Sequence, residues 1–281
     1  MIRIVTLNDT NLGTNSMARL HELTDKLRLA EIDVLCCQGM QRSLDGRQDS
    51  ARKIAELLQM TYCFSATGST VRTQNGGKET TIRGLSILAG DYAWMLNSGS
   101  FSLPGEDPAK KQVAQFAVIR QNGNSVLVIN VELSPVASAQ LQQFRAVFSH
   151  QRLQERYGAV VLCGNRKLAV SSRDLQTVTA LSAYKLASET TANTSGGDDS
   201  AVPTSCSSQD RAGQPVDGVI LTLIARDWAP TAIKIHGASA AHLLTSALAS
   251  DFEIKQSPAK NPNKFFFPLS YSEQWPGMQK A

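Results

Sequence analysis

The apolar positions of this chain follow two periods, and segments of the two kinds alternate along the sequence. Short runs in which apolar residues alternate with polar ones, or follow one another without a break, are typical of β-strands. Longer segments with an apolar residue every three to four positions are typical of amphipathic helices. Strands are predicted at 2–8, 33–40, 61–69, 84–90, 112–134, 159–165, 216–222 and 231–237. Helices are predicted at 16–32, 49–60, 138–158 and 171–181.

Turn-forming residues divide these segments. Asn122-Gly123 predicts a hairpin turn inside the segment 112–134. The polar stretch 71–82 is interpreted as a turn built on Asn75-Gly76-Gly77. A stretch rich in Ser, Thr, Gly and Asp, 191–215, is interpreted as a long loop or lid.

The order of the segments is rich in strands, with helices interspersed in two similar halves. Asp49 or Ser50 is the predicted N-cap of the second helix, because a short polar side chain there can accept a backbone hydrogen bond. Two sheets packed together with helices outside are the simplest arrangement for such an order. The predicted fold class is therefore a two-sheet α/β sandwich.

Composition narrows the function classes. At 42% hydrophobic and 19% charged, the 281 residues suit a folded domain rather than a disordered chain. The formal charge of +4 permits a phosphate-rich partner, but no basic run exceeds Lys110-Lys111, and dedicated nucleic-acid binders usually carry a clustered basic stripe. No segment approaches the ~20 apolar residues that span a bilayer, so no membrane partner is expected.

Cysteine usage points to a reducing compartment. The five cysteines are Cys36, Cys37, Cys63, Cys163 and Cys206. None forms a Cys-x-x-Cys pair, so a structural zinc site is not expected. The first residues read directly as a strand and not as the apolar core of a signal peptide. Together these observations lead us to expect a cytoplasmic protein.

Seven short segments carry a resemblance to a known family. They are Thr6-Leu7-Asn8, Gln38-Gly39, 83–88, 128–134, Gly164-Asn165-Arg166-Lys167, 215–221 and Ser250-Asp251-Phe252. Their order resembles the endonuclease/exonuclease/phosphatase superfamily, which has the DNase I-like fold. The resemblance covers residues 1–254, which we interpret as one domain of this type, and residues 255–281 are a Pro/Phe-rich C-terminal extension.

The resemblance implies an Mg²⁺-dependent phosphoesterase pocket, and it also implies that the pocket has lost its chemistry. Gly39 stands where the family has its metal-binding glutamate, and Asn165 where the family has an aspartate that orients or deprotonates water. Glu132 and Phe252 each stand in place of a family histidine, and Lys167 in place of an asparagine. Losses of this kind cost on the order of 10² to 10⁴ in rate each.

The family pattern is kept at four further positions of the same pocket, Asn8, Gln38, Asp217 and Asp251. The replacements outweigh them, so the leading hypothesis is a catalytically inactive relative of metal-dependent phosphoesterases, kept as a binding or structural module. The pocket would then be vestigial, and no cofactor is expected.

Two alternatives remain open from the sequence. One is a divergent Mg²⁺-dependent nuclease or phosphatase that uses Asn8, Asp217, Asp251 and Glu132, three of which would form a new carboxylate cluster. The other is a metal-independent binder of nucleic acid or phosphate through Arg166 and Lys167. The same two side chains could equally form an internal ion pair with an aspartate of the pocket.

The C-terminal extension, 255–281, differs in character from the rest of the chain. It has four prolines, Phe265-Phe266-Phe267 and Trp275. An apolar cluster flanked by prolines is typical of a segment that covers the domain's own core or of one that docks a protein partner. The sequence leaves both open.

Overall fold

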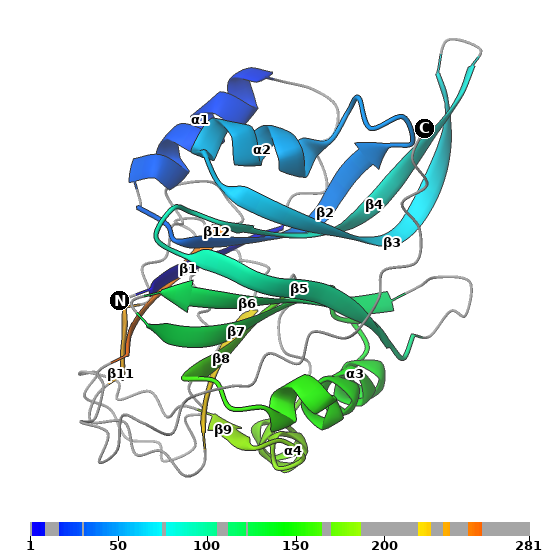
Figure 1. Cartoon of the computed structure of the whole chain (residues 1–281). Helices are drawn as coiled ribbons and strands as arrows, with labels where there is room; N and C mark the ends of the chain where they lie inside the picture. The colour runs from blue at the N-terminus through cyan, green and yellow to red at the C-terminus, as the bar shows by residue number, and fades with distance from the viewer. Residues whose placement is uncertain are drawn as a thin grey trace, which may run out of the picture.

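Two six-stranded sheets pack face to face, with helices on the outside of each (Figure 1). The computed structural model describes residues 2–8, 17–29, 31–74, 77–105, 112–121, 123–164, 170–186, 219–225, 233–236 and 247–254. The predicted α/β sandwich is confirmed within these ranges.

The first sheet contains the N-terminal strands and the last two. Its members are β1 (Ile2–Asn8), β2 (Val34–Ser43), β3 (Thr61–Gln74), β4 (Gly77–Ala89), β11 (Ile233–His236) and β12 (Ala247–Ile254). They lie in the order β11-β12-β1-β2-β4-β3. Among the described strands of this sheet, only β1 and β2 pair in parallel, because the helix α1 (Met17–Leu29) carries the chain back to the starting end of the sheet. The helix α2 (Ser50–Leu58) packs beside α1.

The second sheet repeats this plan. It consists of β5 (Trp94–Leu103), β6 (Gln112–Gln121), β7 (Asn124–Val131), β8 (Ala159–Gly164), β9 (Tyr184–Leu186) and β10 (Val219–Ala225), in the order β5-β6-β7-β8-β10-β9. The helix α3 (Ala137–Ser149) connects the parallel strands β7 and β8, and α4 (Ser172–Thr179) packs against α3. The predicted hairpin between β6 and β7 is confirmed, with Gly123 at a φ of +82°.

The central strands are buried on both faces, which explains their near-continuous apolar runs. In β1 the side chain of Ile4 faces the opposite sheet, whereas Val5 and Leu7 pack under α1 and α2. Cys36 and Cys163 lie in the layer between the sheets, where burial raises the pKa of the Cys36 thiol and the neighbouring Cys163 thiol raises it further. Both cysteines therefore act as small apolar residues.

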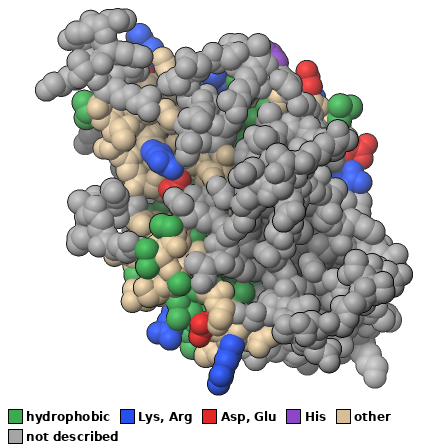
Figure 2. All heavy atoms as spheres, turned by 180° about the vertical axis from the view of Figure 1, so that it is seen from behind, with side chains coloured by type: hydrophobic (Ala, Val, Ile, Leu, Met, Phe, Trp, Pro, Cys, Tyr) green, Lys and Arg blue, Asp and Glu red, His purple; other side chains and the backbone are tan. Residues whose placement is uncertain are grey.

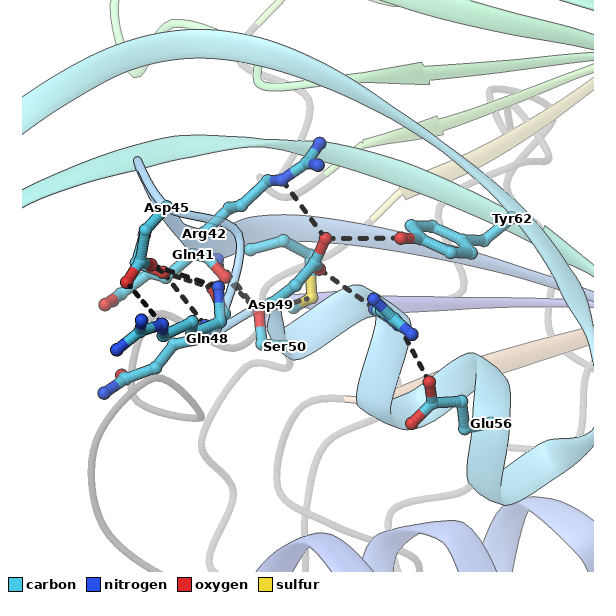
Figure 3. A network of polar contacts seen from close by, with 12 residues as sticks. Gln41, Arg42, Asp45, Gln48, Asp49, Ser50, Glu56 and Tyr62 are labelled. Carbon is cyan, nitrogen blue, oxygen red and sulfur yellow. Dashed lines mark hydrogen bonds and ion pairs between the residues drawn. The ribbon is translucent and has the colours of Figure 1, made fainter. Parts of the chain in front are cut away.

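Asp49 fixes the start of α2, as predicted from its N-cap position (Figure 3). Its Oδ1 accepts a hydrogen bond from the backbone N–H of Arg52 at 3.0 Å. Its Oδ2 accepts from the Tyr62 hydroxyl at 3.3 Å and lies 3.5 Å from Nε of Arg42. One buried carboxylate thus ties together the end of β2, the start of α2 and the start of β3.

The stretch 71–82, interpreted as a polar turn, is instead mostly strand. β3 continues to Gln74 and β4 begins at Gly77, so the two form a long ribbon in which Val71 pairs with Thr80. The chain reverses between Gln74 and Gly77, where the turn was predicted, but the extent of the turn was wrong because Thr and Val favour strands even where a segment is polar overall. Residues 75–76, like the loop 191–215 and the extension 255–281, lie outside the described residues.

Three strands and one helix end also differ from the predictions. β5, β9 and β12 were not predicted, because the centre of β5 contains Asn and Gly, β9 has only three residues and β12 is mixed in polarity. The helix predicted at 138–158 ends at Ser149, since His150 is extended at φ −66° and ψ 141°. His150 then accepts from the backbone N–H of Arg152 at its Nδ1 and starts a short 3₁₀ turn. No helix of the described ranges is long and apolar enough to cross a membrane.

Candidate functional site

Parallel pairing brings several of the predicted site residues to one end of the sandwich. Asn8, the last residue of β1, pairs with Gln38 of β2. Val131, the last residue of β7, pairs with Gly164 at the end of β8. Because the carboxyl ends of parallel strands share one edge, Asn8 and Gly39 of the first sheet and Glu132 of the second lie at the ends of these strand pairs.

Gly39 sits in a β-bulge. The register of β2 against β4 shifts between Cys37, which pairs with Ser86, and Met40, which pairs with Gly84. Gly39 has a φ of +74°, in the left-handed region that costs an L-residue roughly 1 to 2 kcal/mol. The position where a metal-binding glutamate was expected from the family pattern therefore has no side chain and a backbone that favours glycine.

A buried amide network joins the two sheets beneath this bulge. The side-chain N–H₂ of Gln38 donates to Oδ1 of Asn130 at 2.7 Å and to the Thr6 hydroxyl at 2.9 Å. Asn130, from the opposite sheet, donates to the carbonyls of Cys37 and Ser86, each at 3.0 Å. These are the two strand residues that pair just before the register shift, so Asn130 supplies donors at the bulge itself.

Glu132 is bound by an arginine. Its Oε1 accepts from a terminal N–H of Arg83 at 3.0 Å, with the two side chains 24% and 43% exposed. Arg83 lies on β4 and pairs with Gln41 of β2, whereas Glu132 follows β7. The ion pair therefore bridges the two sheets at the end of the sandwich where Gly39 lies.

Comparison with known proteins places this geometry in a structural class. No protein-family model matches the chain, and no curated protein matches it in sequence. Solved structures do match. An endonuclease/exonuclease/phosphatase family protein from Leptotrichia buccalis has a TM-score of 0.60 at 10% identity, covering 90% of this chain and 100% of that one.

Two other matches agree. The endonuclease/exonuclease/phosphatase from Bacteroides vulgatus has a TM-score of 0.55 at 16% identity, covering 90% of this chain and 99% of that chain. The catalytic domain of human Nocturnin, solved with a bound sulfate anion, has a TM-score of 0.54 at 14% identity, covering 90% and 94%.

The chain has the endonuclease/exonuclease/phosphatase fold. At these identities the likeness establishes the fold and leaves the activity to be argued from the site itself.

Two of the predicted pocket residues do not lie with the others in this endonuclease/exonuclease/phosphatase fold. β12 runs antiparallel to β1, so Asp251 pairs with Arg3 and Phe252 with Ile2. Arg3 is five residues from Asn8, which is about 17 Å along a strand. The sequence-based pocket is corrected here, because Asp251 and Phe252 belong to the opposite end of the sandwich. The β12 residue beside the end of β1 is Ala247, which pairs with Leu7.

Other predicted residues lie outside the described ranges. Asn165, Arg166 and Lys167 follow the last residue of β8, and Asp217 precedes β10 by two positions. The hypothesis that Arg166 or Lys167 neutralises the site therefore stays a prediction. The structure shows instead an arginine that sequence reasoning missed, Arg83, whose only signal was a charge beside the predicted strand 84–90.

The described residues do not fit the Mg²⁺ ion that the fold family implies. Magnesium takes oxygen ligands in near-octahedral geometry and is usually held by one or two carboxylates. Gly39 supplies no side chain, and the Glu132 carboxylate is already bound by Arg83. Within the described ranges, no three His, Cys, Asp or Glu side chains come together in a way that could hold a metal.

Proposed function

We propose that this chain is a catalytically inactive protein of the endonuclease/exonuclease/phosphatase fold, kept as a binding or structural module. The observation that carries the proposal is Gly39, which occupies the expected metal-ligand position with a left-handed backbone. At an ordinary strand position, a single substitution back to glutamate could restore the missing metal ligand. At Gly39 the bulge holds the backbone in a conformation that favours glycine, so an acidic residue there would be strained.

The pairing of Arg83 with Glu132 supports the same proposal. Hydrolysis of a phosphoester needs a cation to offset the charge on the phosphoryl oxygens. Here a guanidinium neutralises the nearby carboxylate, so Glu132 is not available as an anionic ligand. An internal cation of this kind stabilises the strand ends without supplying the open coordination positions that a reaction requires.

The surface gives little support to a dedicated nucleic-acid binder. Seen from behind, the described Lys and Arg side chains lie singly among neutral and acidic ones and do not gather in a stripe (Figure 2). Polyanion binding relies on several cations that contact successive phosphates. The described part of this face therefore favours a structural role or the binding of a protein over the electrostatic binding of nucleic acid.

The first test is hydrolysis with Mg²⁺ or Mn²⁺. We expect no chelator-sensitive turnover of plasmid DNA, single-stranded DNA, RNA or an aryl phosphodiester, because the metal-ligand position is empty of side chains. Gly39→Glu should not restore turnover, since the added acid would be strained.

One result would overturn the proposal. It is chelator-sensitive turnover by the unmodified chain that disappears in Glu132→Gln and persists in Glu56→Gln, a matched change on the exposed face of α2.

A second prediction concerns the ion pair. In a double-mutant cycle, Arg83→Met and Glu132→Gln should show a coupling energy of about 0.5 to 1 kcal/mol, limited by the partial exposure of the pair. The exposed pair Arg52–Glu56 on α2, 61% exposed at both side chains, is the control and should couple by only about 0.3 to 0.5 kcal/mol. Urea unfolding measures both. A coupling of zero between Arg83 and Glu132 would contradict an internally neutralised site.

A further inference from the structure

An apolar surface lies at the end of the sandwich opposite the candidate site. We call this end the base; it is defined by Arg3, Asp33 and Gly90, whose backbones are joined by hydrogen bonds of 3.0 and 2.9 Å. The turn that follows Gly90 leads into β5, and the base patch consists of Tyr92 in this turn and of Trp94 and Leu96 at the start of β5. These side chains are 83%, 69% and 52% exposed.

The base patch belongs to an unusually unprotected strand. β5 is the last strand of its sheet and pairs only with β6 among the described strands. Natural edge strands are normally guarded by charged residues, especially lysine. The stretch 92–103 has no charged residue, and it combines exposed aromatic groups with an open strand edge. Such a surface is typical of a site that another segment covers.

The last described strand delivers the chain to the base. Phe252 of β12 pairs with Ile2 at the start of β1, and β12 continues beyond it to Ile254. In Figure 1 the N-terminus, the turn between β4 and β5 and the orange strand β12 all lie on the left. The extension 255–281 therefore starts at the same end of the sandwich as the base patch.

The extension is long enough to reach the patch. Phe265 follows Ile254 by about 11 residues, which can span roughly 36 Å when extended. From β12 the first sheet runs across β1, β2 and β4 to β3, about 19 Å at 4.8 Å per strand, and the second sheet packs about 10 Å away. Since β3 lies against β5, the path is about 29 Å, which is within reach.

We propose that the extension folds back and covers the base patch, with Phe265, Phe266 and Phe267 packed on Tyr92, Trp94 and Leu96. Each buried aromatic ring removes roughly 150 to 250 Å² of surface from water. A tethered segment also acts at an effective concentration in the millimolar range, so a contact too weak for a free partner suffices. This advantage favours the chain's own extension over a second copy.

The test follows Trp94 in the full chain. Trp228→Phe and Trp275→Phe leave Trp94 as the single tryptophan, and acrylamide quenching reports its access to solvent. We expect a shielded Trp94 in this parent. The triple change Phe265→Ser, Phe266→Ser and Phe267→Ser should raise the quenching constant about threefold, towards a side chain that is 69% exposed.

Matched variants separate docking from a general effect. Leu96→Ser alters the patch at a half-exposed position and should also raise quenching. Leu181→Ser alters an equally exposed residue after α4 and should not. The proposal is overturned if Trp94 is as accessible in the parent as in the triple variant. It is equally overturned if the shielding of Trp94 increases with protein concentration and sedimentation shows a dimer over the same range. A second copy of the chain would then cover the patch.

Discussion

Replacing Asn130 with alanine should remove about 3 to 5 kcal/mol from the free energy of unfolding, among the largest effects expected of a single substitution in this chain. Asn130 makes three hydrogen bonds in a fully buried setting, one from Gln38 and two to strand carbonyls. With alanine, the Gln38 amide and the carbonyls of Cys37 and Ser86 each stay buried and lose one hydrogen bond. Each such loss lowers the free energy of unfolding by about 1 to 3 kcal/mol. Urea unfolding monitored by circular dichroism measures the change.

The matched control for this prediction is Asn97→Ala. Asn97 is an exposed residue of β5 in the same sheet as Asn130, and the change should stay within about 0.5 kcal/mol. A loss below about 1 kcal/mol in Asn130→Ala would mean that water replaces the amide, and that the network does not hold the sheets together.

The Asn130 network bears on the candidate site because it explains how the bulge at Gly39 is maintained. Asn130 donates to the carbonyls of Cys37 and Ser86, the pair that precedes the register shift. Gln38, next to the bulge glycine, is held by Asn130 and Thr6. The strand end where an enzyme of this fold would need a metal ligand is therefore fixed by amides, which suits a structural role.

The sandwich could be predicted from sequence because its central strands and helices differ in apolar period. β1, β2 and β8 are buried on both faces and appear as short apolar runs, whereas α2 and α3 place apolar residues at helical spacing. β5 was not predicted because its centre contains Asn and Gly, which are depleted in strands. Its assignment depends on pairing with β6, which is a contact between segments and not a local pattern.

The loss of the acid at Gly39 was visible in the sequence, but its structural consequence was not. A glycine does not reveal whether it adopts a positive φ or lies in a bulge. Arg83 and Glu132 are 49 residues apart, so no spacing rule links them. Asp251 was placed in the pocket from a three-residue match, and only the register of β12 against β1 shows that it lies at the other end.

Substituting Gly84 with alanine should destabilise the protein by about 2 to 4 kcal/mol, because the strands leave no room for a methyl group. A Cβ at this position would lie 2.3 Å from the carbonyl oxygen of Ser65 and 2.6 Å from the ring of Phe64. The carbonyl belongs to the backbone of β3, so the strain is not relieved by a side-chain rotation. β3 and β4 would have to separate.

The control is Gly68→Ala on the neighbouring strand β3. Gly68 is exposed, and a Cβ there meets nothing within 4 Å, so the change should be nearly neutral. If Gly84→Ala unfolds at the same urea concentration as Gly68→Ala, the close approach of β3 and β4 is not a constraint on the fold. Gly84 directly follows Arg83 in β4 and pairs with Met40, the first paired residue after the Gly39 bulge. Its substitution should therefore also disturb the Arg83–Glu132 ion pair. Gly84 is required by packing and Gly39 by its backbone angle, so neither requirement depends on catalysis.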